Sequence, residues 1–183
     1  MLIGCLLFTG IIVDRNFVVM LLHKPEYASY FNVFIIVGSA FLIDMTGGIN
    51  GYIINVSKYY RLTTVIIGGA VICCAISNWM LIPQFGIMGA ALAYLITMFL
   101  LNFTYWLFLK IKFNLQPFGK AHVLIILNAV VTFCAGYFIP HTHNIWLDAA
   151  TRSIVMGLVY IAIAYFFKIS EDINLVFDKI IKH

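Results

Sequence analysis

Six long apolar stretches, separated by short polar connections, constrain this chain more than any other feature of its sequence. The stretches lie near residues 2–22, 33–54, 62–82, 87–109, 122–139 and 147–167. A bilayer has a hydrocarbon core about 30 Å thick, which roughly 20 consecutive apolar residues cross as a helix. Strands with open edges would leave backbone groups without hydrogen bonds in lipid, so we expect helices throughout. The sequence therefore predicts an all-α, polytopic transmembrane helical bundle with six spans.

The composition excludes an ordinary water-soluble domain. Of the 183 residues, 63% are apolar and 10% are charged, against roughly 45–50% and about 25% in typical soluble domains. The basic residues are scattered singly rather than clustered with aromatic residues, which argues against a nucleic-acid partner. All four cysteines lie within apolar stretches, so they indicate neither a disulfide framework nor a metal site. The expected surroundings of the chain are a lipid bilayer, and we expect no cofactor.

The first apolar stretch is interrupted by polar residues. Asp14, Arg15 and Asn16 follow thirteen mostly apolar residues, which are too few to cross a bilayer. Either a segment upstream of Met1 completes this span, or the polar residues lie near a membrane boundary. Arg15 could contact an anionic substrate, although pairing with Asp14 or reaching the lipid head groups is the simpler interpretation.

The distribution of lysine and arginine predicts the orientation in the membrane, because short cytoplasmic loops are enriched in both residues. The segments after the second, fourth and sixth stretches hold eight of them: Lys58, Arg61, Lys110, Lys112, Lys120, Lys168, Lys179 and Lys182. The opposite side holds Lys24, with Arg15 and Arg152 near that boundary. We therefore expect a cytoplasmic C-terminus and, after six crossings, a cytoplasmic start of the chain.

Prolines and small residues predict where helices end and meet. Pro25, Pro83 and Pro140 each fall where an apolar stretch ends. Only Pro83-Gln84-Phe85 separates the third and fourth stretches, so these should form an antiparallel hairpin.

Small side chains on one face of the fourth stretch predict a close helix contact; they are Gly86, Ala90, Ala93, Thr97 and Thr104. Residues 168–183 show helical apolar spacing, which suits an amphipathic helix on the inner membrane surface or a solvated terminal helix.

Asp44 is the most informative single residue, because it falls in the middle of the second stretch. A carboxylate at mid-depth costs about 2.5–3.5 kcal/mol on insertion scales. In a continuous helix, one small and polar face would collect Ala40, Asp44, Gly47, Gly48, Gly51 and Asn55. This face could be a packing interface with Asp44 protonated or hydrogen-bonded, or the wall of a water-filled cavity. Asn78, in the third stretch, could line the same cavity or bond to a neighbouring helix.

Two patterns that suggest enzymes are weak. His143 and Asp148 have the H-x4-D spacing of glycerolipid acyltransferases, but the phosphate-binding element of those enzymes is absent. His141 and His143 lack a third metal ligand in a suitable position, so we interpret them as part of a polar loop. The sequons at Asn55 and Asn102 fit glycosylation poorly, because one is expected to be cytoplasmic and the other lies inside a span. We expect the chain not to be an enzyme.

One segment resembles a known family. Residues 78–94 read NWMLIPQFGIMGAALAY, which is similar to the N-x-x-L-I-P-x-(Y/F)-G-I-x-G-A-A-(L/I)-A-(T/Y) signature of Wzx-type polysaccharide flippases. These belong to the multidrug/oligosaccharidyl-lipid/polysaccharide exporter superfamily. Upstream, GYIINVSKYYR at 51–61 looks like the cytoplasmic turn before that hairpin, and KPEY at 24–27 looks like the preceding boundary. The resemblance covers residues 1–115 well and the last two spans only by hydropathy and position.

The resemblance implies that the chain is the C-terminal portion of a longer transporter. Members have twelve or fourteen spans in two lobes, so six spans would correspond to helices nine to fourteen, with an N-terminal lobe missing. On this basis residues 1–115 form four spans with the hairpin signature, 116–167 form two further spans, and 168–183 form a cytoplasmic amphipathic tail. The implied location is a bacterial inner membrane, with the chain crossing it several times.

The implied activity is the flipping of undecaprenyl-diphosphate-linked oligosaccharide across that membrane, for cell-surface polysaccharide or O-antigen biosynthesis. The family mechanism alternates access to a hydrated cavity between two lobes. The residues expected to line the cavity here are Asp44, Gly48, Gly51, Asn55, Asn78 and Arg15, with Asp44 as an ion-coupling or gating carboxylate. Two alternatives stay open: a multidrug or cation exporter of the same superfamily, and a truncated product that transports nothing.

Overall fold

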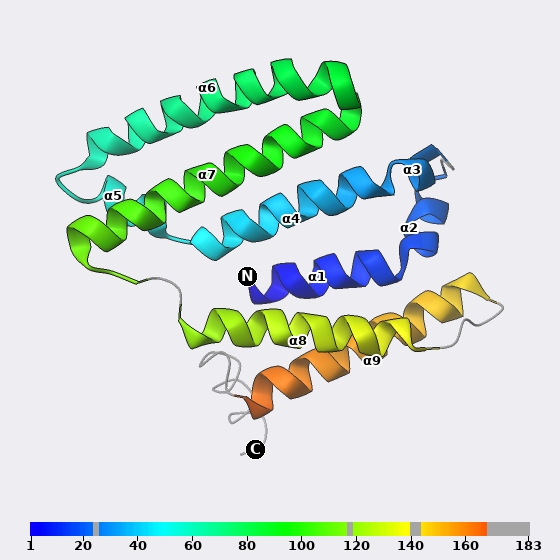
Figure 1. The fold of residues 1–183 in the computed structure, drawn as a ribbon. Coiled ribbons are helices and arrows are strands. Elements are labelled where there is room, and N and C mark those ends of the chain that lie inside the picture. Colours follow the sequence, from blue (N-terminus) through cyan, green and yellow to red (C-terminus); the bar gives the residue numbers. More distant parts are fainter. Residues whose placement is uncertain (24–25, 117–118, 140–143, 168–183) are drawn as a thin grey trace. The chain divides into compact units, whose positions relative to one another are not determined.

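The computed structural model describes residues 1–23, 26–116, 119–139 and 144–167, and within these ranges it contains helices and no strands (Figure 1). Contacts divide the chain into two compact units. Unit 1 comprises Ser29–Pro117 with Met1, and unit 2 comprises Leu2–Ala28 with Phe118–His183. The structure thus groups the first helices with the last two, whereas the sequence suggested a division after residue 115.

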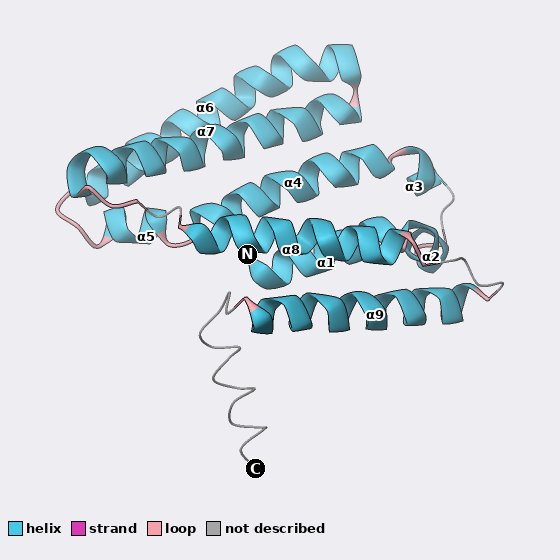
Figure 2. Ribbon diagram, turned by 60° about the horizontal axis from the view of Figure 1, so that its bottom comes forward, coloured by secondary structure: helices cyan, strands magenta, loops and turns pink. Residues whose placement is uncertain are grey.

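Unit 1 is built on a long antiparallel helical hairpin. Helices α6 (Tyr60–Phe85) and α7 (Ile87–Phe113) lie side by side along their lengths in both ribbon views (Figures 1 and 2). Helix α4 (Phe31–Gly47) packs on α7, and the short α5 (Asn50–Asn55) contacts both α6 and α7. The predicted hairpin of the third and fourth stretches is therefore present.

The tip of this hairpin is tighter than the sequence suggested. Pro83 was expected to end a helix, but it lies inside α6, which continues to Phe85. The chain reverses at Gly86 alone, whose φ of 56° is readily adopted only by a residue without a side chain. Three residues further on, Gly89 sits so close to α6 that a Cβ would overlap the Leu81 carbonyl. Glycine thus allows both the reversal and the close approach of the two helices.

The second apolar stretch is divided. The sequence predicted one helix over 33–54, but α4 ends at Gly47 and the chain turns at Gly48, where φ is 50°. Helix α5 then begins at Asn50. The 17 residues of α4 span about 25 Å, which is short of a hydrocarbon core roughly 30 Å thick. Consecutive glycines weaken a helix, and here they end it.

Unit 2 combines the start of the chain with its last two described helices, α8 (Lys120–Tyr137) and α9 (Ile145–Phe166), which pack on each other. Helix α1 (Leu2–Val13) packs on α8 and α9, and α2 (Arg15–Leu21) contacts α9. Between α1 and α2 the axis bends by 83°. The expectation of one helix over 2–22 is therefore wrong, because the helix breaks at Asp14. Helix α3 (Glu26–Ser29) is a single turn.

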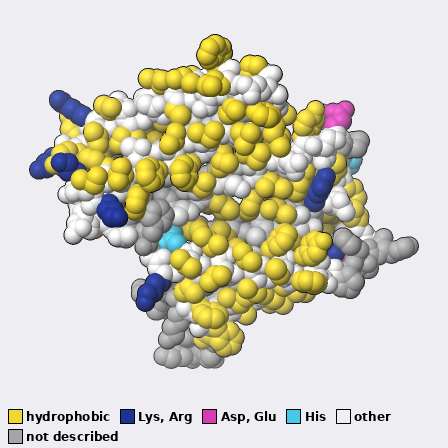
Figure 3. Space-filling view, viewed as in Figure 1, with side chains coloured by type: hydrophobic (Ala, Val, Ile, Leu, Met, Phe, Trp, Pro, Cys, Tyr) yellow, Lys and Arg dark blue, Asp and Glu magenta, His cyan; other side chains and the backbone are white. Residues whose placement is uncertain are grey.

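The described helices fit a multi-pass membrane protein. Four of them, α6 to α9, are long and apolar enough to cross a bilayer, and the bent pair α1–α2 would make five. Large apolar side chains remain exposed, such as Trp79 at 80% and Val71 at 63%, and Thr63 is the one buried residue of α6. Figure 3 shows hydrophobic side chains covering α6 and α7. A surface of this kind suits lipid rather than water.

Some sequence predictions fall on residues that the structure does not describe. They concern Lys24, Pro25, Pro140, His141, His143 and the tail 168–183 with its lysines.

Candidate functional site

A pocket of about 310 Å³ opens beside Asp44 in unit 1. All four helices of the unit contribute to its lining, which consists of Asp44, Gly47, Gly48, Gly51, Tyr52, Asn55, Thr63, Ile67, Asn102 and Tyr105. Four of the six residues proposed from the sequence to line a cavity are in this set: Asp44, Gly48, Gly51 and Asn55. The structure therefore brings them together around one carboxylate.

The reason these residues meet differs from the one suggested by the sequence. A continuous helix would have placed Gly51 and Asn55 on the face of Asp44, further along the same axis. Instead the chain turns at Gly48, and α5 carries Gly51 and Asn55 to the pocket from a separate helix. The continuous helix from which this lining was predicted is therefore wrong, and a role of these residues in a transport cavity stays a prediction.

Asp44 has a direct partner on α7. The Asn102 side-chain amide donates a hydrogen bond to Asp44 Oδ1 at 3.1 Å and a second to the Met98 carbonyl at 3.0 Å. This bond fits the packing interpretation of Asp44, while the water-filled cavity stays a prediction. The Asp44 carboxylate is hydrogen-bonded to a neighbouring helix, yet the side chain stays exposed at the pocket.

Two glycines let α7 side chains approach α4 and α5. A Cβ on Gly47 would overlap the amide of Asn102, so the Asp44–Asn102 contact needs glycine there. A Cβ on Gly51 would lie 3.4 Å from the Tyr105 ring, tighter than most such contacts. Tyr105 in turn belongs to a buried cluster with Ile54 and Leu109. The small residues noted in the sequence thus hold the pocket wall against α7.

Unit 1 holds two buried polar groups without hydrogen-bond partners among the described residues, and one of them belongs to the pocket lining. Thr63, 4% exposed, lines the pocket, and its hydroxyl has no hydrogen-bond partner within the part of the chain that the structure describes. The side-chain amide nitrogen of Asn50, 2% exposed, likewise has none there. A buried polar group without a partner costs about 1–3 kcal/mol, so water or a ligand group would stabilise such a position.

The charge of the pocket is acidic. Asp44 is its one ionisable carboxylate, and no lysine or arginine is among the lining residues. Carboxylate, amide, hydroxyl and phenol oxygens around an open space can hold water, a proton or a cation. They offer no positive charge to an anionic diphosphate.

Asn78 and Arg15 do not join this pocket. Asn78 donates within its own helix, to the Cys74 carbonyl at 2.9 Å, and not to another helix as the sequence suggested. Arg15 belongs to unit 2, where its guanidinium donates to the Ala28 carbonyl at 2.7 Å. The Asn78 contact joins residues four apart within α6, and neither Asn78 nor Arg15 is among the residues that line the Asp44 pocket.

Sequence reasoning missed Asn102, Thr63 and Tyr105. Asn102 was considered only as a glycosylation sequon, although an amide inside a predicted span is itself a sign of a cross-helix hydrogen bond. Thr63 and Tyr105 carry no comparable sign, because threonine and tyrosine occur at many positions in membrane helices. Their places at the pocket follow from how α6 and α7 pack.

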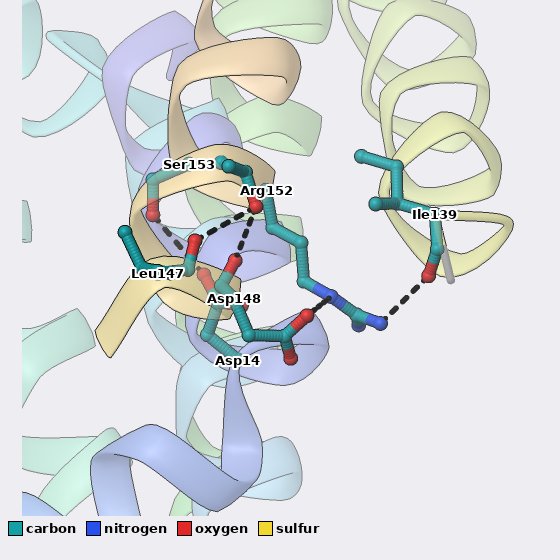
Figure 4. A network of polar contacts seen from close by, with 7 residues as sticks. Asp14, Ile139, Leu147, Asp148, Arg152 and Ser153 are labelled. Carbon is teal, nitrogen blue, oxygen red and sulfur yellow. Dashed lines mark hydrogen bonds and ion pairs between the residues drawn. The ribbon is translucent and has the colours of Figure 1, made fainter. Parts of the chain in front are cut away.

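Unit 2 contains a second polar cluster, drawn in Figure 4. The guanidinium of Arg152, 3% exposed, donates from Nε to Asp148 at 3.3 Å and from Nη2 to the Ile139 carbonyl at 2.7 Å. The Ser153 hydroxyl donates to Asp14 Oδ2 at 3.1 Å. Asp148, half of the H-x4-D pattern, is therefore an ion-pair partner of Arg152. The bond from Arg152 to the Ile139 carbonyl joins α9 to the residues just beyond the end of α8.

Among the described residues, no group of three or more histidine, cysteine, aspartate or glutamate side chains is placed to hold a metal ion. Comparison of the chain with protein-family models, with curated proteins and with solved structures finds no match.

Proposed function

We propose that this chain is the C-terminal portion of a Wzx-type flippase, which moves undecaprenyl-diphosphate-linked oligosaccharide across a bacterial inner membrane. The single observation that supports this most is the pocket at Asp44, next to the α6–α7 hairpin whose tip carries the flippase-like signature. In this proposal the chain crosses the membrane six times, with α4 and α5 together making the second span and α1 and α2 the first. The C-terminus is cytoplasmic.

The role proposed for the pocket is coupling or gating rather than binding of the diphosphate. Asp44 is exposed to the pocket and held by Asn102, and the lining lacks positive charge. A proton or cation entering there would change the Asp44–Asn102 interaction, which joins α4 to α7. The anionic part of the substrate would be bound by the missing N-terminal lobe, the partner that this proposal requires.

A cation exporter of the same superfamily is the second candidate. The specific observation in its favour is the same acidic lining, because a carboxylate beside the Tyr52 and Tyr105 rings suits an organic cation. A truncated product that transports nothing is the third candidate. An in-frame continuation upstream of Met1 with a second hairpin signature would exclude it.

The test replaces Asp44 by Asn in the full-length transporter, in a bacterium from which the chromosomal gene has been deleted. We expect at least a tenfold loss of surface polysaccharide, with lipid-linked oligosaccharide accumulating inside. The reason is that the amide of an asparagine at position 44 cannot release or take up a proton as a carboxyl group can. Glu26→Gln is the matched control, since Glu26 is an exposed carboxylate of α3 outside the pocket. Unchanged polysaccharide in Asp44→Asn would contradict the role of Asp44. Normal polysaccharide after gene deletion, together with increased sensitivity to cationic dyes, would favour the cation exporter.

A further inference from the structure

A second pocket, of about 300 Å³, lies within unit 2 between α1, α2 and α9. Its walls are apolar, with Leu6 and Leu7 on one side and Met156 on the other, except at Asp14 and Ser153. The volume lies at the lower end of the roughly 300–1,000 Å³ of ligand sites. Gly10 and Gly157 line this pocket, and the space beside each is empty: a Cβ built on either would have no atom within 4 Å. A larger side chain at either position would occupy the pocket.

The polar end of this pocket can accept hydrogen bonds. Ser153 donates to Asp14 Oδ2, and no other hydrogen bond reaches that carboxylate from any described residue. A carboxylate has about four lone-pair positions, so acceptor capacity remains. A group that donates several hydrogen bonds and carries positive charge would therefore complement Asp14.

This polar end lies at the margin of the apolar part of unit 2. Arg152, next to Ser153, bonds to the Ile139 carbonyl just beyond the end of α8. Phe17 of the pocket packs edge-on against Trp146 with ring centroids 5.2 Å apart, and aromatic residues of this kind gather at membrane interfaces. From Asp14 the apolar wall follows α1 back to Leu6, a length of about 12 Å. A bilayer crossed by α9 would thus have the Asp14 end of the pocket at head-group level and the Leu6 end in hydrocarbon.

We propose that this pocket binds a bilayer phospholipid with a primary ammonium head group, the ammonium bonded to Asp14 and the upper acyl chain lying along α1 and α9. An ammonium offers three donors and a positive charge to the carboxylate. The apolar walls match the first part of an acyl chain. Arg15, the next residue, is exposed and carries positive charge near this end, and its guanidinium donates to the Ala28 carbonyl. This site does not depend on the transport function proposed for unit 1.

The test measures lipid adducts on the full chain by native mass spectrometry, in detergent with equal amounts of phosphatidylethanolamine and phosphatidylglycerol of identical acyl chains. We expect phosphatidylethanolamine adducts to exceed phosphatidylglycerol adducts roughly threefold to tenfold, as the net contribution of one ordinary hydrogen bond allows. In Gly157→Leu, the leucine side chain fills the pocket, so the abundance of phosphatidylethanolamine adducts should fall to that of phosphatidylglycerol adducts. Gly69→Leu is the control, because Gly69 on α6 also has open space around its Cβ position but is outside the pocket.

Asp14→Asn separates head-group recognition from folding, since the amide oxygen can still accept from Ser153. The ratio of the two lipids should fall to about one while total lipid binding through the acyl chain persists. A preference that survives in Asp14→Asn, or adducts that survive in Gly157→Leu, would overturn the proposal. If Gly157→Leu does not stay monodisperse on size-exclusion chromatography, the Asp14→Asn ratio decides alone.

Discussion

Several polar side chains inside the apolar helices have a specific hydrogen-bond partner on another helix. Asp44 accepts from Asn102, and Asn128, 1% exposed, donates to the Tyr160 carbonyl across α8 and α9 at 3.1 Å. Tyr160 donates in turn to the Leu2 carbonyl at 2.8 Å. Hydrogen bonds between membrane helices contribute about 0.6–2 kcal/mol each. They fix which helices pack together more than they raise stability.

The contact between Gly47 and Asn102 gives a prediction for the pocket. Gly47→Ala should lower the free energy of unfolding by about 1–2 kcal/mol, because the new methyl group displaces the Asn102 amide from Asp44. The measurement is the thermal midpoint in detergent, with Gly68→Ala as the control, since Gly68 has open space around its Cβ position. In an Asn102→Ala background the cost of Gly47→Ala should nearly vanish. An equal cost in both backgrounds would show that Asn102 is not what Gly47 accommodates.

The buried Arg152 gives a prediction for unit 2. Its guanidinium uses two separate donors, to Asp148 and to the Ile139 carbonyl, which a lysine ammonium cannot reach in the same geometry. Arg152→Lys should destabilise the protein by about 1–3 kcal/mol, seen as a lower unfolding midpoint. Arg61→Lys, on an exposed arginine beside Tyr60, should change the midpoint little. Equal effects of the two substitutions would contradict a specific role for Arg152.

At the scale of elements, the α6–α7 hairpin was predictable and its tip was not. The apolar stretches and the short connection required two antiparallel helices, because both must cross the same bilayer. Pro83 suggested an earlier helix end, but proline removes only one hydrogen bond donor, and a helix packed along its whole partner can continue through it. The chain reverses only at Gly86, because glycine readily adopts the positive φ that the turn requires.

The close packing of this hairpin is testable at Gly89. Gly89→Ala should destabilise the protein by about 1–3 kcal/mol, because the Cβ would press on the Leu81 backbone, which cannot rotate away as a side chain can. Gly69→Ala should be neutral or slightly stabilising, since its Cβ has open space and alanine favours helix. Thermal unfolding in detergent compares the two. A neutral Gly89→Ala would mean that α6 and α7 can separate at no cost.

At the scale of the whole molecule, cationic residues gather at one end of the α6–α7 hairpin. In unit 1, Lys58 precedes α6, Arg61 lies in its first turn, and Lys110 and Lys112 lie in the last turn of α7. Aromatic rings accompany them: Lys58 lies over Tyr59 at 5.2 Å and Lys110 over Trp106 at 5.0 Å. Such a belt of cations and aromatic rings is typical of the membrane surface facing the cytoplasm.

Labelling with a membrane-impermeant maleimide tests this orientation. The background is a full chain with its four cysteines replaced by alanine. Gln84→Cys, at the Gly86 end of the hairpin, should react in intact spheroplasts, whereas Lys112→Cys should react only after permeabilisation. Both positions are exposed, so access through the membrane decides the result. The reverse pattern would place the cationic end outside and overturn the topology.

The sequence by itself determined the helical class and the position of most apolar helices, and it drew attention to Asp44 and the glycines that follow it. In apolar stretches of membrane-spanning length, only a helix pairs the backbone N–H and C=O groups within the same segment. A carboxylate among glycines indicates a close, polar contact between helices. These properties are local, and a single chain segment carries them.

Only the tertiary structure decided that the second stretch breaks at Gly48, that Asn102 is the partner of Asp44, and that α1 packs with α8 and α9. Each outcome depends on the contacts of segments far apart in the chain. A glycine pair permits a break without requiring it, and an amide permits many partners. The packing of α5 and α7 selects one outcome from those that the sequence allows.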